Sequence, residues 1–137
     1  MALVSEADLK KIIEEGDDKL LVERAKQVGE ALKERRLSSS QIRGIFGSVR
    51  RIEMDWQAPK RNPDPERLTM AQREFSLLRP RLSYQAEKER GKGPGVIDLR
   101  DVLIPAMQMV GKEYTRFRNF VDFFEAILAY HKAAGGQ

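Results

Sequence analysis

The sequence has 137 residues, of which 41% are hydrophobic and 34% charged, and its formal net charge is +4. This length and composition predict one globular domain with a buried core and argue against a disordered chain. With no cysteine and a single histidine, the chain excludes disulfides, thiolate chemistry and a histidine-rich metal site.

The N-terminal part of the chain predicts two helices. The first is expected over residues 5–15, with Ser5 as its N-cap and Asp8 in the capping-box position. The second is expected to be capped by Asp17 or Asp18. Its apolar residues recur with helical spacing and form one stripe, made of Leu21, Ala25, Val28 and Leu32.

The stretch SSSQIRGIFGSVRRIEMDW, residues 38–56, predicts a third helix with a serine cap. Residues 58–67 hold three prolines and predict a surface loop. A fourth helix is expected over residues 68–90, and Pro80 inside it is expected to kink or split it. The buried stripe of the third helix is expected to be Ile42, Ile45, Phe46, Val49, Ile52 and Trp56.

The C-terminal part begins with GKGPG, residues 91–95, which predicts a mobile connector. Helices are expected over residues 98–110 and 114–134. In the last helix, Phe123 and Tyr130 widen the apolar sector to about half of the cylinder at 100° per residue. So broad a face is either central to the core or partly presented to a partner, which makes both residues candidate subunit contacts.

No strand alternation and no internal repeat is visible along the chain. The sequence therefore predicts an all-α fold, a single domain over residues 1–137 built as a small bundle of about five to six helices. No apolar run approaches the length of a membrane span, and the start MALVSEADLKK lacks the order of a signal peptide. We expect a cytoplasmic protein without membrane contact.

Residues that carry enzyme chemistry are scarce. His131 is expected to be structural, because a general base needs a nucleophile and an orienting group nearby. GKGPG does not match the P-loop pattern. The acidic residue Asp122 is interpreted as a salt-bridge partner of Arg118, four residues before it. We expect no enzymatic activity, no metal site and no cofactor.

Charge is unevenly distributed along the chain. Residues 1–34 hold 6 basic and 9 acidic side chains, residues 35–92 hold 14 and 7, and residues 93–137 hold 5 of each. The basic middle predicts a surface that faces a polyanion. The alternative is an arginine-rich surface that faces only solvent.

The third helix carries the most suggestive basic residues. Arg43, Gly47 and Arg50 point the same way, and Arg51 lies adjacent. A rise of 1.5 Å per residue separates Arg43 from Arg50 by about 10 Å, which suits two phosphates of one strand. Each mid-helix glycine, Gly44 and Gly47, costs about 1 kcal/mol relative to alanine. Close approach of a ligand, such as a nucleic-acid backbone, or of another chain accounts for that cost, and so does tight packing against another helix.

A second basic row follows Pro80. Arg81, Tyr84 and Lys88 recur with helical spacing and suit phosphate contact with some base stacking; the alternative is a half-buried tyrosine flanked by surface charges. Arg79 adds charge to this stretch. No known DNA- or RNA-reading module is visible, so contacts are expected to be with the backbone, with little reading of base identity.

Three blocks of the sequence share an order and spacing with a known family. They are SSSQIRGIFGSVRRI, LLRPRLSYQAEKERG and FRNFVDFFEAILAYHKAAGG. The most specific is the last, with the pattern F-x-x-F-x-x-F-F-E-A-I-x-A-Y-H-K. In these blocks the chain resembles the small subunit of the type III-A CRISPR effector, the Csm complex.

The resemblance implies an all-helical bundle without catalytic activity. It implies that several copies stack as the inner filament of the effector and line the channel that holds the crRNA and the target RNA. It further implies contacts with the crRNA-binding backbone subunits and with the large Cas10-type subunit. The candidate nucleic-acid-binding residues are then Arg43, Arg50, Arg51, Arg79, Arg81, Tyr84 and Lys88.

Two other readings remain open from sequence. One is a helical protein–protein adaptor with an incidental basic patch, and the other is a free-standing DNA-binding or architectural protein. The acidic N-terminal helices offer a poor surface for RNA, so we expect them on the outside of the assembly or at a subunit contact.

Overall fold

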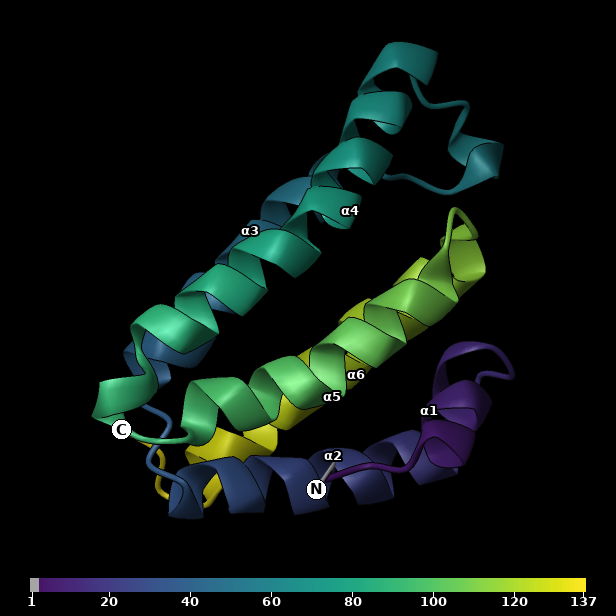
Figure 1. The fold of residues 1–137 in the computed structure, drawn as a ribbon. Coiled ribbons are helices and arrows are strands. Elements are labelled where there is room, and N and C mark those ends of the chain that lie inside the picture. The colour runs from purple at the N-terminus through teal and green to yellow at the C-terminus, as the bar shows by residue number, and fades with distance from the viewer. Residues whose placement is uncertain (1–2) are drawn as a thin grey trace.

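The structure, a computed structural model that describes residues 3–137, contains six α-helices and no strand within that range (Figure 1). Two short 3-10 turns, Pro59–Arg61 and Arg90–Lys92, lie in the connections. The predicted all-α class is therefore confirmed. The helices are α1 (Glu6–Ile13), α2 (Asp18–Glu34), α3 (Ser39–Asp55), α4 (Pro65–Lys88), α5 (Gly95–Val110) and α6 (Tyr114–Ala133).

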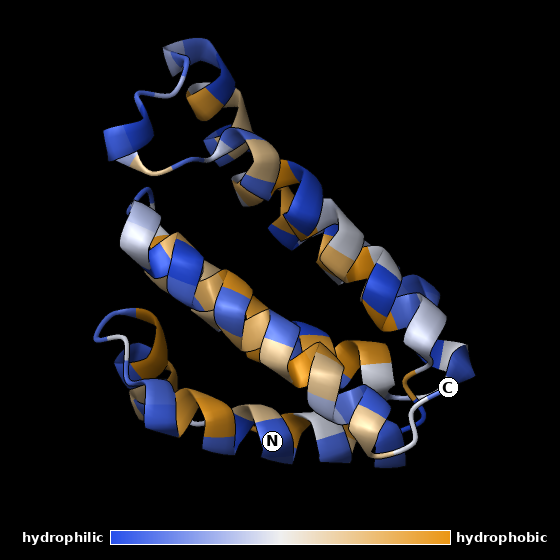
Figure 2. Ribbon diagram, turned by 180° about the vertical axis from the view of Figure 1, so that it is seen from behind, coloured by the Kyte–Doolittle hydropathy of each residue, from blue (hydrophilic) through white to orange (hydrophobic). Residues whose placement is uncertain are grey.

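The helices form two antiparallel pairs that share a core. Helices α3 and α4 run side by side as one long hairpin, and α5 and α6 run side by side as a second (Figure 1). Helix α6 packs against α2, α3 and α5, and the short helix α1 packs against α5 and α6. Hydrophilic residues dominate the connection between α3 and α4, whereas the helices mix both kinds along their length (Figure 2).

The predicted helix starts are confirmed at atomic detail. Ser5 accepts a hydrogen bond from the Asp8 amide at 3.1 Å, and Asp17 accepts one from the Leu20 amide at 3.0 Å. Only half of a capping box forms at Ser5, because the Asp8 carboxylate pairs with Arg24 at 2.9 Å instead. These local bonds satisfy amide groups that a helix start otherwise leaves free.

The core is built around aromatic side chains from three helices. Trp56, which follows α3, stacks on Phe117 of α6 with ring centroids 4.2 Å apart. Phe75 of α4 meets both rings edge-on, at 5.6 Å and 5.3 Å. Phe46 of α3 meets Phe124 of α6 edge-on at 5.0 Å. This cluster fixes the α3–α4 hairpin against α6, since aromatic pairs in such geometries add to the gain from burial.

One predicted subunit contact is corrected by the fold. Phe123 is 0% exposed within the chain, so its side chain is not available to another subunit. The cause is the central place of α6, which is covered by α1, α2, α3 and α5. Tyr130 is partly exposed and packs at the rim of the core, so it stays a candidate subunit contact.

Pro80 was expected to kink or split the fourth helix, and it does not split it. Helix α4 continues through Pro80 from Pro65 to Lys88. Both Pro80 and Ser76, whose carbonyl loses its helical partner, are exposed, so water can replace the missing hydrogen bond. The segment 91–95 also differs from an open connector, because Gly95 already begins α5 and is buried.

Candidate nucleic-acid interface

Two hollows lie between α3 and the C-terminal half of α4, and a third adjoins them on the α4 side; together they are here called the α3–α4 groove. Their volumes are about 500, 170 and 400 Å³. Gln85 of α4 lines all three, and Gly44 of α3 lines two of them. The floor contains Ile45, Leu78, Leu82 and Met107, and the basic side chains around it are Arg36, Arg81, Lys88 and Lys92.

The two mid-helix glycines of α3 are not packed against the rest of the chain. A Cβ atom at Gly44 would have no neighbour within 4 Å, and one at Gly47 would meet only the Arg51 guanidinium at 3.9 Å. By contrast, a Cβ atom at Gly29 of α2 would lie 2.7 Å from the His131 amide nitrogen. Packing within the chain therefore explains Gly29 but leaves Gly44 and Gly47 unexplained.

Arg43 and Arg51 lie on the same exposed face of α3 as these glycines. Arg51 donates a hydrogen bond to the Ser48 hydroxyl at 3.1 Å. Arg43 forms no salt bridge or side-chain hydrogen bond with any of residues 3–137. Both guanidiniums are thus available to an anion that approaches the glycine surface.

Arg50 has a different environment from Arg43. Its guanidinium pairs with Glu53 at 2.8 Å and with Glu125 of α6, and it lies over the Phe46 ring at 4.9 Å from the centroid. The sequence suggested Arg43 and Arg50 as two equivalent phosphate ligands. In the fold, Arg50 faces α6 and its charge is balanced by two carboxylates.

The Arg50 pair belongs to a network that crosses from α3 to α6. Arg118 pairs with Glu53, and it also pairs with Asp122 at 3.2 Å, the contact expected from their spacing. Burial alone would raise the pKa of Glu53, but hydrogen bonds from Arg118 and Arg50 outweigh burial and hold its pKa below the ordinary value of 4.5. Glu53 is therefore ionised and joins two helices.

This lowered pKa predicts an acid dependence of stability. A carboxyl whose pKa is depressed by folding stabilises the fold above its ordinary pKa and loses that contribution as pH falls through the folded value. We expect Glu53→Gln to make the free energy of unfolding less dependent on pH below about 4.5. Urea unfolding of both proteins between pH 3 and pH 7, pH values chosen to span the titration range of a carboxyl, measures this. Parallel curves would contradict the prediction.

The α4 side of the groove presents an exposed aromatic ring between two cations. Tyr84 is 69% exposed, so the half-buried alternative is wrong. It shares the hollow of about 400 Å³ with Arg81 and Lys88. Arg81 also pairs with Glu74 at 2.9 Å. Arg79, two residues before Arg81, is turned by 200° from it and lies away from this row.

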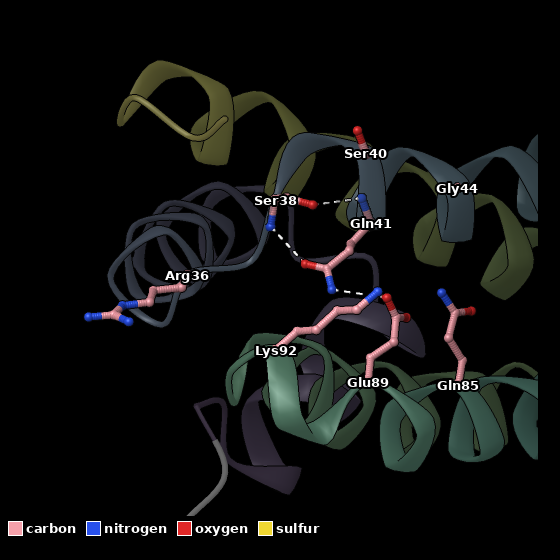
Figure 3. A pocket seen from close by; sticks show the side chains of 8 residues that line it. All are labelled: Arg36, Ser38, Ser40, Gln41, Gly44, Gln85, Glu89 and Lys92. Atoms are coloured by element: carbon pink, nitrogen blue, oxygen red, sulfur yellow. Dashed lines mark hydrogen bonds between the residues drawn. The ribbon is translucent and has the colours of Figure 1, made fainter.

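A polar link that was not predicted from the sequence crosses the groove. Gln41 accepts from the Ser38 amide at 2.9 Å through its side-chain oxygen and completes a capping box. Its side-chain nitrogen donates to Glu89 at 3.1 Å, and this bond lowers the pKa of Glu89. Figure 3 shows Gln41 reaching from α3 toward Glu89, and Gln85 extending from α4 toward Gly44. Glutamine three residues after a serine cap was the sequence signal for this arrangement.

Residues 3–137 contain neither a membrane-spanning helix nor a cluster of metal ligands. No helix there is long and apolar enough to cross a membrane. No group of three or more histidine, aspartate or glutamate side chains comes together there as metal ligands would.

The fold and the groove define a class of protein: a small all-helical bundle with a basic, glycine-containing groove on its surface. The chain belongs to the Csm2 Type III-A family, whose model matches residues 15–137. It is therefore a structural subunit of the type III-A CRISPR complex. The match spans α2 to α6 and so includes both sides of the groove. No curated protein and no solved structure matches the chain.

Proposed function

We propose that the chain is a non-catalytic RNA-binding subunit of the type III-A complex in the cytoplasm. It holds the backbone of the crRNA and target RNA along the α3–α4 groove. Several copies stack side by side, pack against the crRNA-binding backbone subunits and adjoin the large Cas10-type subunit.

The observation that carries this proposal is the open glycine surface of α3. A helix interior that omits two side chains without packing against its own chain is weakened for no internal gain. Because the position of Gly44 lines the groove, a sugar-phosphate backbone can lie directly against the helix there. The exposed guanidiniums of Arg43 and Arg51 stand beside it to meet phosphates.

The α4 side supplies the complementary contacts. Arg81 and Lys88 contact phosphates, and Tyr84 offers its exposed ring to a base or a ribose. Arg50 joins the contact only if phosphate replaces Glu125, and Arg79 contributes charge from outside the groove. All these contacts read the backbone, so the subunit accepts any guide sequence.

Salt dependence provides the test of these contacts. Each neutralised phosphate releases counterions, so log affinity falls with log salt concentration by about 0.7–0.9 per contact. We expect Arg43→Ala combined with Arg51→Ala to flatten this slope for a guide–target duplex by about one to two units. The measurement is fluorescence anisotropy of the full chain with a labelled duplex over a salt series.

Arg50→Ala is the matched control for the salt series. It removes the same charge from the same helix, but the charge is already balanced by Glu53 and Glu125. Because it removes one charge where the double variant removes two, it should change the slope by less than half as much as the double variant. An unchanged slope in the double variant would remove Arg43 and Arg51 from the contact set.

Assembly is tested by native purification from the source cells, followed by mass spectrometry and RNA sequencing. Recovery of several copies together with crRNA supports the proposal. An RNA-free monomer with an unrelated protein partner supports the adaptor reading instead. One copy offers few phosphates, so binding by stacked copies is expected to exceed binding by a single copy through avidity.

A further inference from the structure

The turn between α2 and α3 is held from both sides by the ends of other helices. Leu37 in this turn is 3% exposed. A Cβ atom at Gly95, the first residue of α5, would lie 2.7 Å from the Leu37 Cβ atom. On the α6 side, the His131 Nε2–H donates to the Leu37 carbonyl at 2.6 Å. The backbone that leads into α3 is therefore fixed between α5 and α6.

The segment that follows α6 holds the first residue of α3. The Ser39 amide donates to the Gln137 carbonyl at 2.7 Å, and the Ser39 hydroxyl donates to the Gly136 carbonyl at 3.2 Å. Gly136 lies on the His131 ring so closely that a Cβ atom there would stand 2.2 Å from Cε1. Because no side chain fits at Gly136, this segment can reach Ser39 only with glycine at that position.

Together with the core, these contacts hold α3 at two positions along its length. The middle of the helix is fixed by Phe46 against Phe124, and its start is fixed by Ser39 against residues 136–137. Arg43 lies one helical turn after Ser39, about 6 Å along the axis. An error in the direction of the first turn therefore moves the Arg43 guanidinium relative to the groove.

We propose that Gly136, Gln137 and His131 are positioning residues for RNA binding, because they set the direction of the first turn of α3 and with it the place of Arg43. This inference rests on the proposed function of the α3–α4 groove. The positioning residues themselves contact no RNA: Gly136 and Gln137 act through Ser39, and His131 acts through the Leu37 carbonyl.

Ser39→Pro is the sharpest test, because it removes both hydrogen bonds to residues 136–137 at once. Proline is favoured at the first position of a helix, where its missing amide proton is normally free. Ser38 has φ −80° and ψ 156°, an extended conformation that suits a residue before proline. The capping box of Ser38 and Gln41 is left intact.

We expect Ser39→Pro to weaken binding of a guide–target RNA duplex by about threefold to tenfold, which lies in the lower part of the range of coupling between neighbouring residues. In an Arg43→Ala background the same substitution should weaken binding no further, since the guanidinium that it misplaces is absent. A merely destabilising change would weaken binding equally in both backgrounds, and that result would overturn the proposal.

Gly136→Ala is the second variant and covers the case in which Ser39→Pro does not fold. It should show the same dependence on Arg43, and hydrogen exchange of the first turn of α3 should become faster while exchange in α4 is unchanged. Gly91→Ala is the control, because a Cβ atom there has no neighbour within 4 Å. If the parent binds RNA and neither Ser39→Pro nor Gly136→Ala changes the affinity, the positioning role alone is overturned. A parent that does not bind RNA would overturn the proposed function as well.

Discussion

Phe123→Ala is expected to lower the free energy of unfolding of the isolated chain by about 3–5 kcal/mol, the range for a phenylalanine removed from a core. Phe123 is 0% exposed, and it lies on a helix that four other helices contact. Removing its ring leaves a cavity that the surrounding helices can fill only in part. Chemical denaturation of the monomer measures the effect.

Comparing Tyr130→Ala with Phe123→Ala separates a residue at a subunit contact from a residue of the core. Tyr130 is partly exposed, so its loss should destabilise the monomer less than the loss of Phe123. If Tyr130 lies at a subunit contact, the substitution impairs assembly more than it lowers monomer stability. A Phe123→Ala protein that unfolds like the parent but fails to assemble would contradict the placement of Phe123 in the core.

Much of the fold could be predicted from sequence because the signals are local. Ser5, Asp17 and Ser38 cap helices as expected, since each cap bonds an amide three residues away. The apolar stripe of α3 is buried as expected, since helical spacing alone brings those residues to one face. Gly16 ends the first helical segment with a positive φ of 69°, a conformation that glycine adopts readily.

The parts that could not be predicted depend on contacts distant in sequence. Whether the broad apolar sector of α6 is core or interface depends on how many helices cover it. From the sequence, Arg50 was expected to be available to phosphate, because its partner Glu125 is 75 residues away along the chain. Pro80 was expected to kink or split α4. That the helix is not split depends on the exposure of Pro80 to water, which is a property of the packed hairpin.

The candidate site shows the same division between local and distant information. Arg43, Arg51 and Tyr84 were found by their spacing and are exposed in the structure. Arg36 and Lys92 reach the groove from turns, where no periodic pattern marks them. The sequence also could not separate an open glycine from a packed one, because Gly29 and Gly44 both lie within predicted helices.

Replacing both open glycines should raise stability and lower RNA affinity together. Alanine is favoured over glycine in a helix interior by about 1 kcal/mol, and a Cβ atom at Gly44 or Gly47 meets no neighbour closer than 3.9 Å. We therefore expect Gly44→Ala with Gly47→Ala to raise the free energy of unfolding by about 1–2 kcal/mol. The added methyl groups hold the RNA backbone away from the helix, and we expect affinity to fall about tenfold, equivalent to about 1.4 kcal/mol.

Gly29→Ala is the same chemical change, but we expect it to lower the free energy of unfolding. A Cβ atom at Gly29 would lie 2.7 Å from the His131 amide nitrogen and 2.8 Å from the Tyr130 Cβ atom, so α2 and α6 would have to separate. Denaturant unfolding and duplex binding of all three proteins test the pair of effects. A double variant that is more stable and binds RNA like the parent would contradict the proposed contact. The gain in stability would confirm the free space at the two glycines, and the unchanged affinity would exclude RNA from it. The glycines of α3 would then be open for another partner.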